Sequence, residues 1–303
     1  MKLEKINKAS HIIKSKTNTG VYVFKDKSAL LIDTGYDEAN EEQINNILKE
    51  NNLALKHIIS THAHADHEAG NEYFRKRYPE LLIYTSKIEK AFIENKDLLS
   101  YALFNSAPPR EIFKDYESDV VDSVLDIGIN VINNEEFNII SLKGHSPGQI
   151  GVVTPDRVCY LADGLYSKKV LDTYFFPYTI DIAQSIETLH SINNIDADYF
   201  VLSHSKNIIP KDEIPSVVEK NLEHIDRFLD IIYNFLDQPL TKEQVTQKII
   251  IPNHRPFGSK DNPFSNRHYF VIFLTVSAYL SYLYNTDKID IYLENGMMYY
   301  KQR

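Results

Sequence analysis

The feature that most constrains this chain is the run Thr61-His62-Ala63-His64-Ala65-Asp66-His67, which packs three imidazoles and a carboxylate into six positions. The run follows an apolar, strand-like segment over residues 55–60. Neutral imidazole nitrogens and carboxylate oxygens are ligands for zinc and neighbouring divalent metals. Without a cation, four such crowded donors would repel one another or stay unsatisfied. The run therefore predicts a metal site; the alternative is a polar loop that carries histidines by chance.

The composition limits the class of protein that can carry this site. With 303 residues, 43% of them hydrophobic and 25% charged, the chain fits a soluble protein of one or two domains rather than a disordered or collagen-like one. The N-terminus lacks the apolar run of a signal peptide. The longest apolar stretch, over residues 269–283, is interrupted by threonine and serine, so we expect no membrane span.

Cysteine content and net charge bear on compartment and partners. The single cysteine, Cys159, lies in an apolar run and is expected to be a buried thiol rather than a nucleophile. The absence of a disulfide fits a reducing compartment, and we predict a cytoplasmic location. The formal charge of −9 opposes non-specific attraction to nucleic acid.

Hydrophobic patterns predict alternating strands and helices up to about residue 205. An antiparallel hairpin over 20–24 and 29–33 should lead into a helix over 37–51 and the strand that delivers the metal run, a βαβ unit. The proline-containing segment 104–119 predicts a surface insertion. The other expected elements are helices over 68–78, 88–99 and 182–195, and strands over 81–85, 120–126, 137–142, 150–154, 158–162 and 199–204.

A boundary near residues 210–215 separates this region from a helical tail, so we predict two domains, 1–210 and 211–303. Apolar residues recur at helical spacing after the boundary, and Thr241 begins a second helix with a capping-box pattern. A third helix is expected over 268–284. The chain ends in an expected hairpin with an Asn-Gly turn. Three helices and a hairpin resemble a winged helix.

Further candidate ligands follow other apolar runs, where loops on a rigid scaffold place chemistry. They are the His145 of Gly144-His145-Ser146-Pro147-Gly148, the Asp163 of Leu161-Ala162-Asp163-Gly164, the His204 of Ser203-His204-Ser205, and the Asp33 of Leu31-Ile32-Asp33-Thr34-Gly35. With the His62–His67 run, this ordered series resembles the metallo-β-lactamase superfamily. The resemblance implies an α/β, four-layer αββα sandwich as the fold of residues 1–210.

The resemblance also implies a dinuclear site. One zinc would be held by His62, His64 and His145, and a second by Asp66, His67 and His204, with Asp163 as the bridging ligand. The same ligands accept iron or manganese. Such a set leaves coordination positions open for a shared water, as a catalytic site requires. Asp33 is interpreted as a group that orients the ligands through hydrogen bonds rather than as a ligand; the alternative is a turn aspartate.

The ligand set favours hydrolysis. Both the Thr-His-x-His-x-Asp-His and the Gly-His-Ser-Pro-Gly patterns are similar to those of glyoxalase II thioesterases, and Asp163-Gly164-Leu165-Tyr166 resembles the Asp-x-x-Tyr of metal-dependent lactonases. We therefore predict a zinc-dependent hydrolase in which a metal-bridging hydroxide attacks a thioester, ester or lactone carbonyl. The predicted catalytic residues are Asp66, as a proton shuttle, Asp163 and Tyr166, whose hydroxyl would stabilise the oxyanion. A packed aromatic is the alternative for Tyr166.

Two other functions stay open. The tail resembles that of lactamase-beta-like hydrolases, some of which cleave RNA, so a phosphodiester hydrolase is the second hypothesis. Its residues 211–303 hold 11 Lys/Arg and 12 Asp/Glu, a balance that disfavours nucleic acid as a partner. A metal-binding sensor without turnover is the third. We expect a small-molecule acyl substrate and no membrane partner, and interpret the tail as a lid or a homodimer contact.

Overall fold

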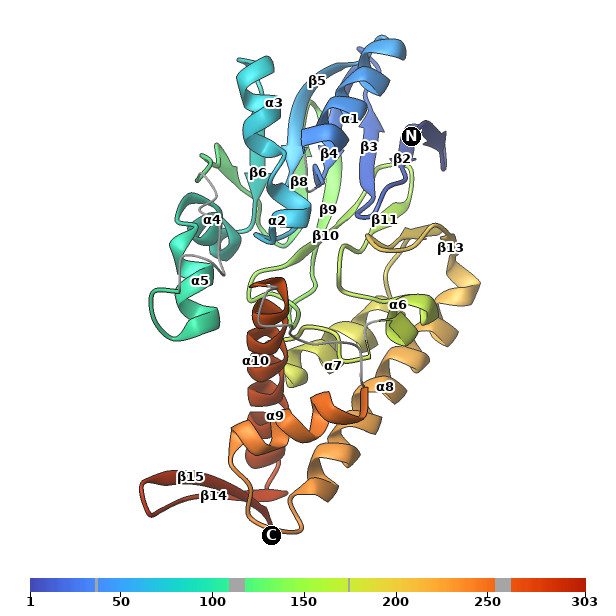
Figure 1. The fold of residues 1–303 in the computed structure, drawn as a ribbon. Helices are drawn as coiled ribbons and strands as arrows, with labels where there is room; N and C mark the ends of the chain where they lie inside the picture. The colour runs from blue at the N-terminus through green and yellow to red at the C-terminus, as the bar shows by residue number, and fades with distance from the viewer. Residues whose placement is uncertain (36–37, 109–117, 174, 254–262) are drawn as a thin grey trace.

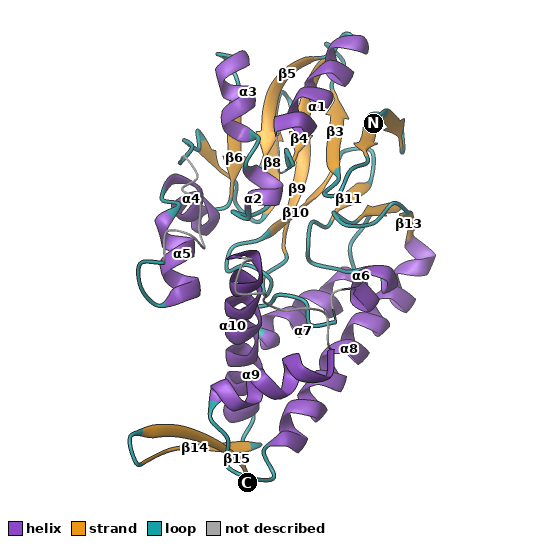
Figure 2. Ribbon diagram, viewed as in Figure 1, coloured by secondary structure: helices purple, strands orange, loops and turns teal. Residues whose placement is uncertain are grey.

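Two β-sheets pack face to face in the computed structural model, and helices cover their outer faces (Figure 1). The structure describes residues 1–35, 38–108, 118–173, 175–253 and 263–303. Figure 2 shows the strands lying between layers of helices, with a further group of helices and a hairpin at the C-terminal end. The predicted four-layer αββα sandwich with a mostly helical C-terminal region is confirmed.

The first sheet has seven strands, arranged in the order in which they occur along the chain. They are β1 (Leu3–Lys5), β2 (Ser10–Ile13), β3 (Thr19–Val23), β4 (Ser28–Ile32), β5 (Ala54–Ile59), β6 (Leu82–Thr85) and β7 (Ser123–Val124). The expected hairpin is the antiparallel pair β3 and β4. Helix α1 (Glu38–Glu50) connects β4 to its parallel neighbour β5, which confirms the βαβ unit.

The second sheet has six strands in the order β13-β12-β11-β10-β9-β8. They are β8 (Gly128–Ile132), β9 (Glu135–Ser141), β10 (Ile150–Val153), β11 (Val158–Tyr160), β12 (Tyr199–Val201) and β13 (Ile208–Pro210). All pairs are antiparallel except β11 with β12. The edge strand β8 was not expected from the sequence.

Three apolar clusters hold the sandwich together. Between the sheets, side chains such as Leu30 and Ile59 of the first sheet meet Phe137 and Val152 of the second. Helices α1 and α3 (Asn71–Arg77) cover the outer face of the first sheet. Helix α7 (Ile182–Ile192) and the beginning of α8 (Ile214–Phe235) cover the second, where Cys159 is fully buried as expected. Burial of these apolar surfaces is the main stabilising contribution to the fold.

Three expected elements were wrong in extent. The helix expected over 68–78 is replaced by the short α2 (Ala65–Glu68) and α3, and the helix expected over 88–99 by α4 (Lys87–Glu94) and α5 (Asp97–Phe104). Asn95 has a non-helical backbone and separates α4 from α5. The strand expected over 120–126 is reduced to β7. The Ile83 N–H donates to the Asp122 carboxylate at 2.8 Å and not to a backbone carbonyl, so the regular pairing of strands is interrupted at this point. Most of the expected insertion at 104–119 lies outside the described residues.

The tail contains α8, α9 (Lys242–Ile250), α10 (Pro263–Asn285) and the hairpin β14 (Ile289–Glu294) and β15 (Met297–Gln302). The capping box at Thr241 is confirmed. Asn295 and Gly296 both have positive φ, as an Asn-Gly hairpin turn requires. Helix α8 packs into the sandwich at its beginning and into the tail cluster further along. The winged-helix assignment and the boundary at 210 stay predictions. No helix within the described part of the chain is long and apolar enough to cross a membrane.

Candidate metal centre

The seven predicted donors come from segments far apart in the chain, and the structure brings them together. His62 and His64 follow β5, His145 lies between β9 and β10, Asp163 follows β11, and His204 follows β12. Asp66 and His67 lie in α2. Their donor atoms form three overlapping groups whose members lie within 4.8 Å of one another. The groups are His62, His64 and His145; His62, His67 and Asp163; and Asp66, His67 and His204.

The first group consists of three imidazoles. His64 Nδ1 lies 3.0 Å from His62 Nε2 and 2.9 Å from His145 Nε2. Imidazole nitrogens that bind one tetrahedral zinc at about 2.0–2.1 Å lie about 3.3 Å apart. The spacing in this group is therefore close to that of three ligands around a single cation.

The group of Asp66, His67 and His204 adds a carboxylate. Asp66 Oδ2 lies 3.5 Å from both His67 Nε2 and His204 Nε2. Asp163 lies between this group and the three imidazoles of the first, with Oδ2 3.6 Å from His145 Nε2 and 3.3 Å from His204 Nε2, and Oδ1 3.6 Å from His67 Nε2. Asp163 thus has the position that a bridging ligand needs.

Unsatisfied buried atoms test whether these residues fit a metal. Among the described residues, His67 Nε2 and Asp163 Oδ1 are buried and have no hydrogen-bond partner. A buried polar atom without a partner costs about 1–3 kcal/mol, and more if charged. Both atoms point into the donor cluster, so a cation there would satisfy them. The donor set of nitrogens and carboxylate oxygens suits zinc, iron or manganese.

The pKa shifts agree with a site that requires positive charge. Burial lowers the pKa of His62 well below its usual value, and the neighbouring imidazoles lower it further, so this ring is neutral and can offer a lone pair. Burial also opposes protonation of His67, but Asp66, Asp33 and Asp163 raise its pKa well above the usual value. The carboxylates therefore hold a proton at His67 wherever no metal takes its place.

Hydrogen bonds from outside the cluster orient the donors. Asp33 accepts from His67 Nδ1 at 2.8 Å and from the Thr61 N–H and hydroxyl at 2.8 and 2.9 Å. It thus has the orienting position that the sequence predicted, and it aims His67 Nε2 at the cluster. His204 Nδ1 lies 3.0 Å from the Lys16 carbonyl, which orients the ring in the same way.

Glu89 of α4 is a residue that the sequence reasoning missed. It is fully buried, and its carboxylate accepts hydrogen bonds from the Ala63 N–H at 2.9 Å, the Gly148 N–H at 2.7 Å and the Ser146 hydroxyl. One side chain therefore joins the loop of His62 and His64 to the loop of His145. Burial raises the pKa of Glu89, whereas the three donors lower it.

Tyr166 contacts one of the candidate ligands, His145. Its hydroxyl is 2.8 Å from His145 Nδ1, a nitrogen that also lies 3.1 Å from the Tyr178 carbonyl. Asn221 of α8 holds the Tyr166 backbone, accepting from its N–H at 3.0 Å and donating to its carbonyl at 2.8 Å. In this arrangement Tyr166 orients His145, and its predicted contact with the substrate carbonyl stays a prediction.

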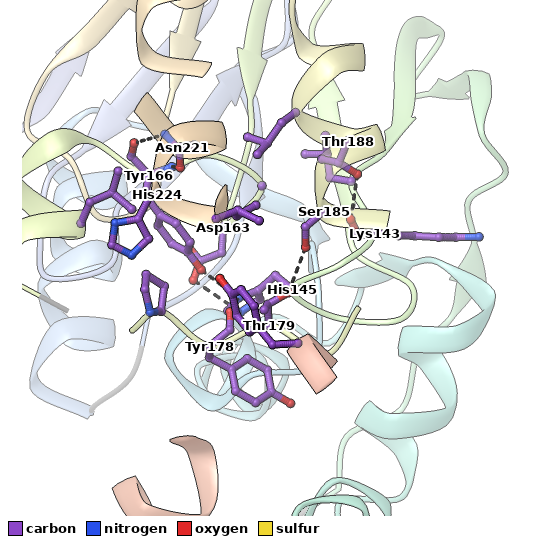
Figure 3. Close-up of a pocket in the computed structure, with 17 residues that line it drawn as sticks. Lys143, His145, Asp163, Tyr166, Tyr178, Thr179, Ser185, Thr188, Asn221 and His224 are labelled. Atoms are coloured by element: carbon purple, nitrogen blue, oxygen red, sulfur yellow. Dashed lines mark hydrogen bonds and ion pairs between the residues drawn. The ribbon is translucent and has the colours of Figure 1, made fainter. Parts of the chain in front are cut away.

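A pocket that is partly open to solvent lies beside the cluster (Figure 3). His145, Asp163 and Tyr166 line it on the metal side, and α8 and α10 of the tail contribute further residues. Among the aromatic residues near the site, Tyr178 lines this cavity, whereas Phe176 belongs to the apolar cluster of the tail. The tail residues are Asn221, His224, Ile225 and Tyr279.

Comparison with curated proteins finds distant relatives. The hydroxyacylglutathione hydrolase of Prochlorococcus marinus (strain MIT 9312) is 28% identical over 166 residues, which cover 53% of this chain and 56% of that protein. Hydroxyacylglutathione hydrolase 1 of Vibrio vulnificus (strain YJ016) is 27% identical over 157 residues, covering 51% and 50%. The chain thus matches only about half the length of these relatives.

Comparison with solved structures extends over the whole chain. A beta-lactamase domain protein from Burkholderia ambifaria superposes with a TM-score of 0.74 at 14% identity, covering 99% of this chain and 93% of that one. A metallo-beta-lactamase family protein from Thermus thermophilus gives 0.70 at 16% identity, covering 99% and 97%. At such identities the likeness concerns the fold. The family profile of the metallo-beta-lactamase superfamily matches residues 14–204, so the chain belongs to this superfamily.

Proposed function

We propose that this protein is a dinuclear, zinc-dependent hydrolase that cleaves a thioester. The observation that carries the proposal is the position of Asp163, between three imidazoles on one side and Asp66, His67 and His204 on the other. Two adjacent cation positions that share a carboxylate suit the activation of water, whereas a structural zinc site is closed by four ligands. Superfamily membership supports hydrolysis, and the distant hydroxyacylglutathione hydrolase relatives favour a thioester over other acyl compounds.

Each residue contributes a definite part. His62, His64 and His145 would hold one metal, and Asp66, His67 and His204 the other, with Asp163 shared. When bound, the metals supply a nucleophilic water at neutral pH and polarise the carbonyl oxygen. Asp33 and Tyr166 keep the imidazoles in the orientation that presents the required nitrogens.

Asp66 is the residue best placed to move a proton. Its side chain is 37% exposed, whereas that of Asp163 is only 8% exposed, so Asp66 is the more accessible to a leaving group. The Thr17 hydroxyl donates to Asp66 Oδ2 at 3.1 Å and fixes the carboxylate. We infer that Asp66, as a carboxylate, takes up the proton that the attacking water gives up and passes it to the departing thiolate.

Hydrolysis of a substrate panel by the metal-loaded protein tests the proposal. The panel holds a thioester, a lactone and bis(p-nitrophenyl) phosphate. We expect thioester hydrolysis and about two metals per chain, and we expect Asp163→Ala to lower both, the rate by at least about 100-fold. Asp126→Ala, at an exposed carboxylate away from the cluster, is the matched control. Activity on the phosphodiester alone would overturn the thioesterase proposal in favour of nucleic-acid hydrolysis, and two bound metals without activity on any substrate would favour a sensor.

A further inference from the structure

The C-terminal hairpin of β14 and β15 projects from the tail at the end of the molecule far from the sandwich (Figure 1). Its base is anchored, since Ile289 is fully buried in the apolar cluster of the tail. Its tip is open to solvent: Leu293 is 73% exposed, and its cross-strand neighbour Met298 is 48% exposed. A two-stranded hairpin alone is at best marginally stable in water, and clustered exposed apolar residues mark interaction surfaces.

The outer edge of β15 is already paired, whereas that of β14 is free. The Tyr300 N–H donates to the Leu240 carbonyl at 2.9 Å, and the Tyr300 carbonyl accepts from the Leu240 N–H at 3.1 Å. Tyr300 lies opposite Ile291 in the hairpin. In an antiparallel pair, opposite residues exchange both backbone hydrogen bonds or neither, so the backbone groups of Ile291 point away from β15. Those of Leu293 do so by alternation, and no other described segment pairs with this edge.

A second copy of β14 complements this edge. A twofold axis through Ile291 pairs the two copies of Ile291 with each other and Leu293 with Ile289 of the second copy. The backbone groups of all these residues face the free edge, so they can exchange hydrogen bonds. The pairing also places each exposed Leu293 beside the buried Ile289 of the other chain. The tip of one hairpin is thereby covered by the base of the other.

Charged side chains favour this register over its neighbours. An axis through Tyr292 would place Asp290 opposite Glu294 of the second copy, and an axis through Asp290 would place two aspartates opposite each other. Like charges directly opposite are destabilising, although Arg303 partly neutralises Asp290 at 2.8 Å. With the axis through Ile291, Asp290 lies opposite Tyr292, and no like charges meet.

We propose that two copies of this chain associate through the free edges of their β14 strands and form one four-stranded antiparallel sheet. The association joins the two tails and uses no residue of the metal centre. It is therefore independent of the proposed hydrolysis.

Sedimentation equilibrium of the full chain over a range of concentrations tests this inference. We expect a monomer–dimer equilibrium. Leu293→Lys should raise the dissociation constant of the dimer at least about 100-fold, because the lost apolar contact occurs twice. Met297→Lys is the matched control: Met297 is also an exposed apolar residue at the tip, but it lies on β15, away from the paired edge. Its effect should stay below about threefold.

Two substitutions of Tyr292 test the register. Both remove the ring, but Tyr292→Glu places a like charge opposite Asp290 of the second copy, and Tyr292→Lys places an opposite charge there. The dimer with Tyr292→Lys should be at least about fivefold tighter than the dimer with Tyr292→Glu, since the contact occurs twice. The difference should disappear when each variant also carries Asp290→Asn.

Three results would overturn the inference. They are a wild type that stays monomeric at every soluble concentration, a dimer that Leu293→Lys weakens no more than Met297→Lys does, and equal dissociation constants for the two Tyr292 variants. The first would leave the hairpin to a different protein, the second would assign the dimer to another face, and the third would exclude the axis through Ile291. Far-UV circular dichroism establishes that each variant is folded.

Discussion

Replacement of Glu89 by glutamine should weaken the connection between the two loops that carry His62, His64 and His145. In the wild type, Oε1 accepts from the Gly148 N–H and the Ser146 hydroxyl, and Oε2 accepts from the Ala63 N–H. Glutamine can keep the first oxygen, but its amide N–H₂ then faces the Ala63 N–H, so one buried donor loses its acceptor and meets another donor.

The magnitude follows from these contacts. A buried donor without a partner costs about 1–3 kcal/mol. Burial raises the pKa of Glu89, so an uncharged side chain recovers part of this cost at pH 7. We expect Glu89→Gln to lower the free energy of unfolding by about 2 kcal/mol, and Glu89→Ala by about 4 kcal/mol, because alanine leaves all three donors unpaired and opens a cavity.

The assay is urea unfolding followed by far-UV circular dichroism, which suits a chain without tryptophan. Glu94→Gln is the matched control: Glu94 lies on the same helix, but its bonds go to Lys90 and the Val121 N–H at the surface. Its effect should be below about 1 kcal/mol. Metal affinity should also fall in Glu89→Gln and not in Glu94→Gln. Equal changes in the two variants would refute the reasoning.

Three further predictions follow from the structure. Burial would lower the pKa of His204, but Asp163 and Asp66 raise it to about 9. The protonated His204 ring therefore stabilises the fold below about pH 6.5, and this stabilisation is lost as the pH rises through about 9. The metal-free protein should therefore be about 2 kcal/mol more stable in urea unfolding at pH 6.5 than at pH 9.5, and His204→Asn should reduce this difference; an unchanged difference contradicts the assignment. Asn221→Ala should lower kcat, with metal content by elemental analysis unchanged, because the Tyr166 backbone loses two hydrogen bonds; loss of metal instead would mean that Asn221 supports the ligands themselves. Burial raises the pKa of the fully buried Cys159 thiol, so the native protein should not react with Ellman's reagent while the unfolded protein reacts with one equivalent, and fast labelling of the native state would be inconsistent with the fold.

The donors could be predicted from the sequence because each stands in a short motif at the end of an apolar run. The motif shows both the residue type and its place at a strand end, as for Asp163 after β11 and His204 after β12. Asp33 stands in a motif of the same kind, directly after β4, and its orienting role stays a prediction. The assignment of these residues to particular metals remains a prediction.

Glu89 could not be predicted, because its local pattern suggests a different role. Ser86 and Glu89 have the spacing of a capping box, in which the glutamate side chain returns to the N-cap backbone. Ser86 does cap α4, but the Glu89 carboxylate instead bonds to Ala63, Ser146 and Gly148, the last two nearly 60 positions away. Such long-range partners leave no local signal. The break at Asn95 was missed similarly, since neither glycine nor proline marks it.

Residues of both the sandwich and the tail line the pocket, and this division affects how such a protein can change during evolution. The candidate metal donors lie on loops and on the short helix α2 of the sandwich, whereas His224, Ile225 and Tyr279 belong to helices of the tail. Substitutions at these three positions alter the shape and polarity of the pocket without removing any donor. The proposed chemistry and the choice of substrate can therefore diverge independently, and a new specificity can be selected in the tail while the donor cluster is inherited unchanged.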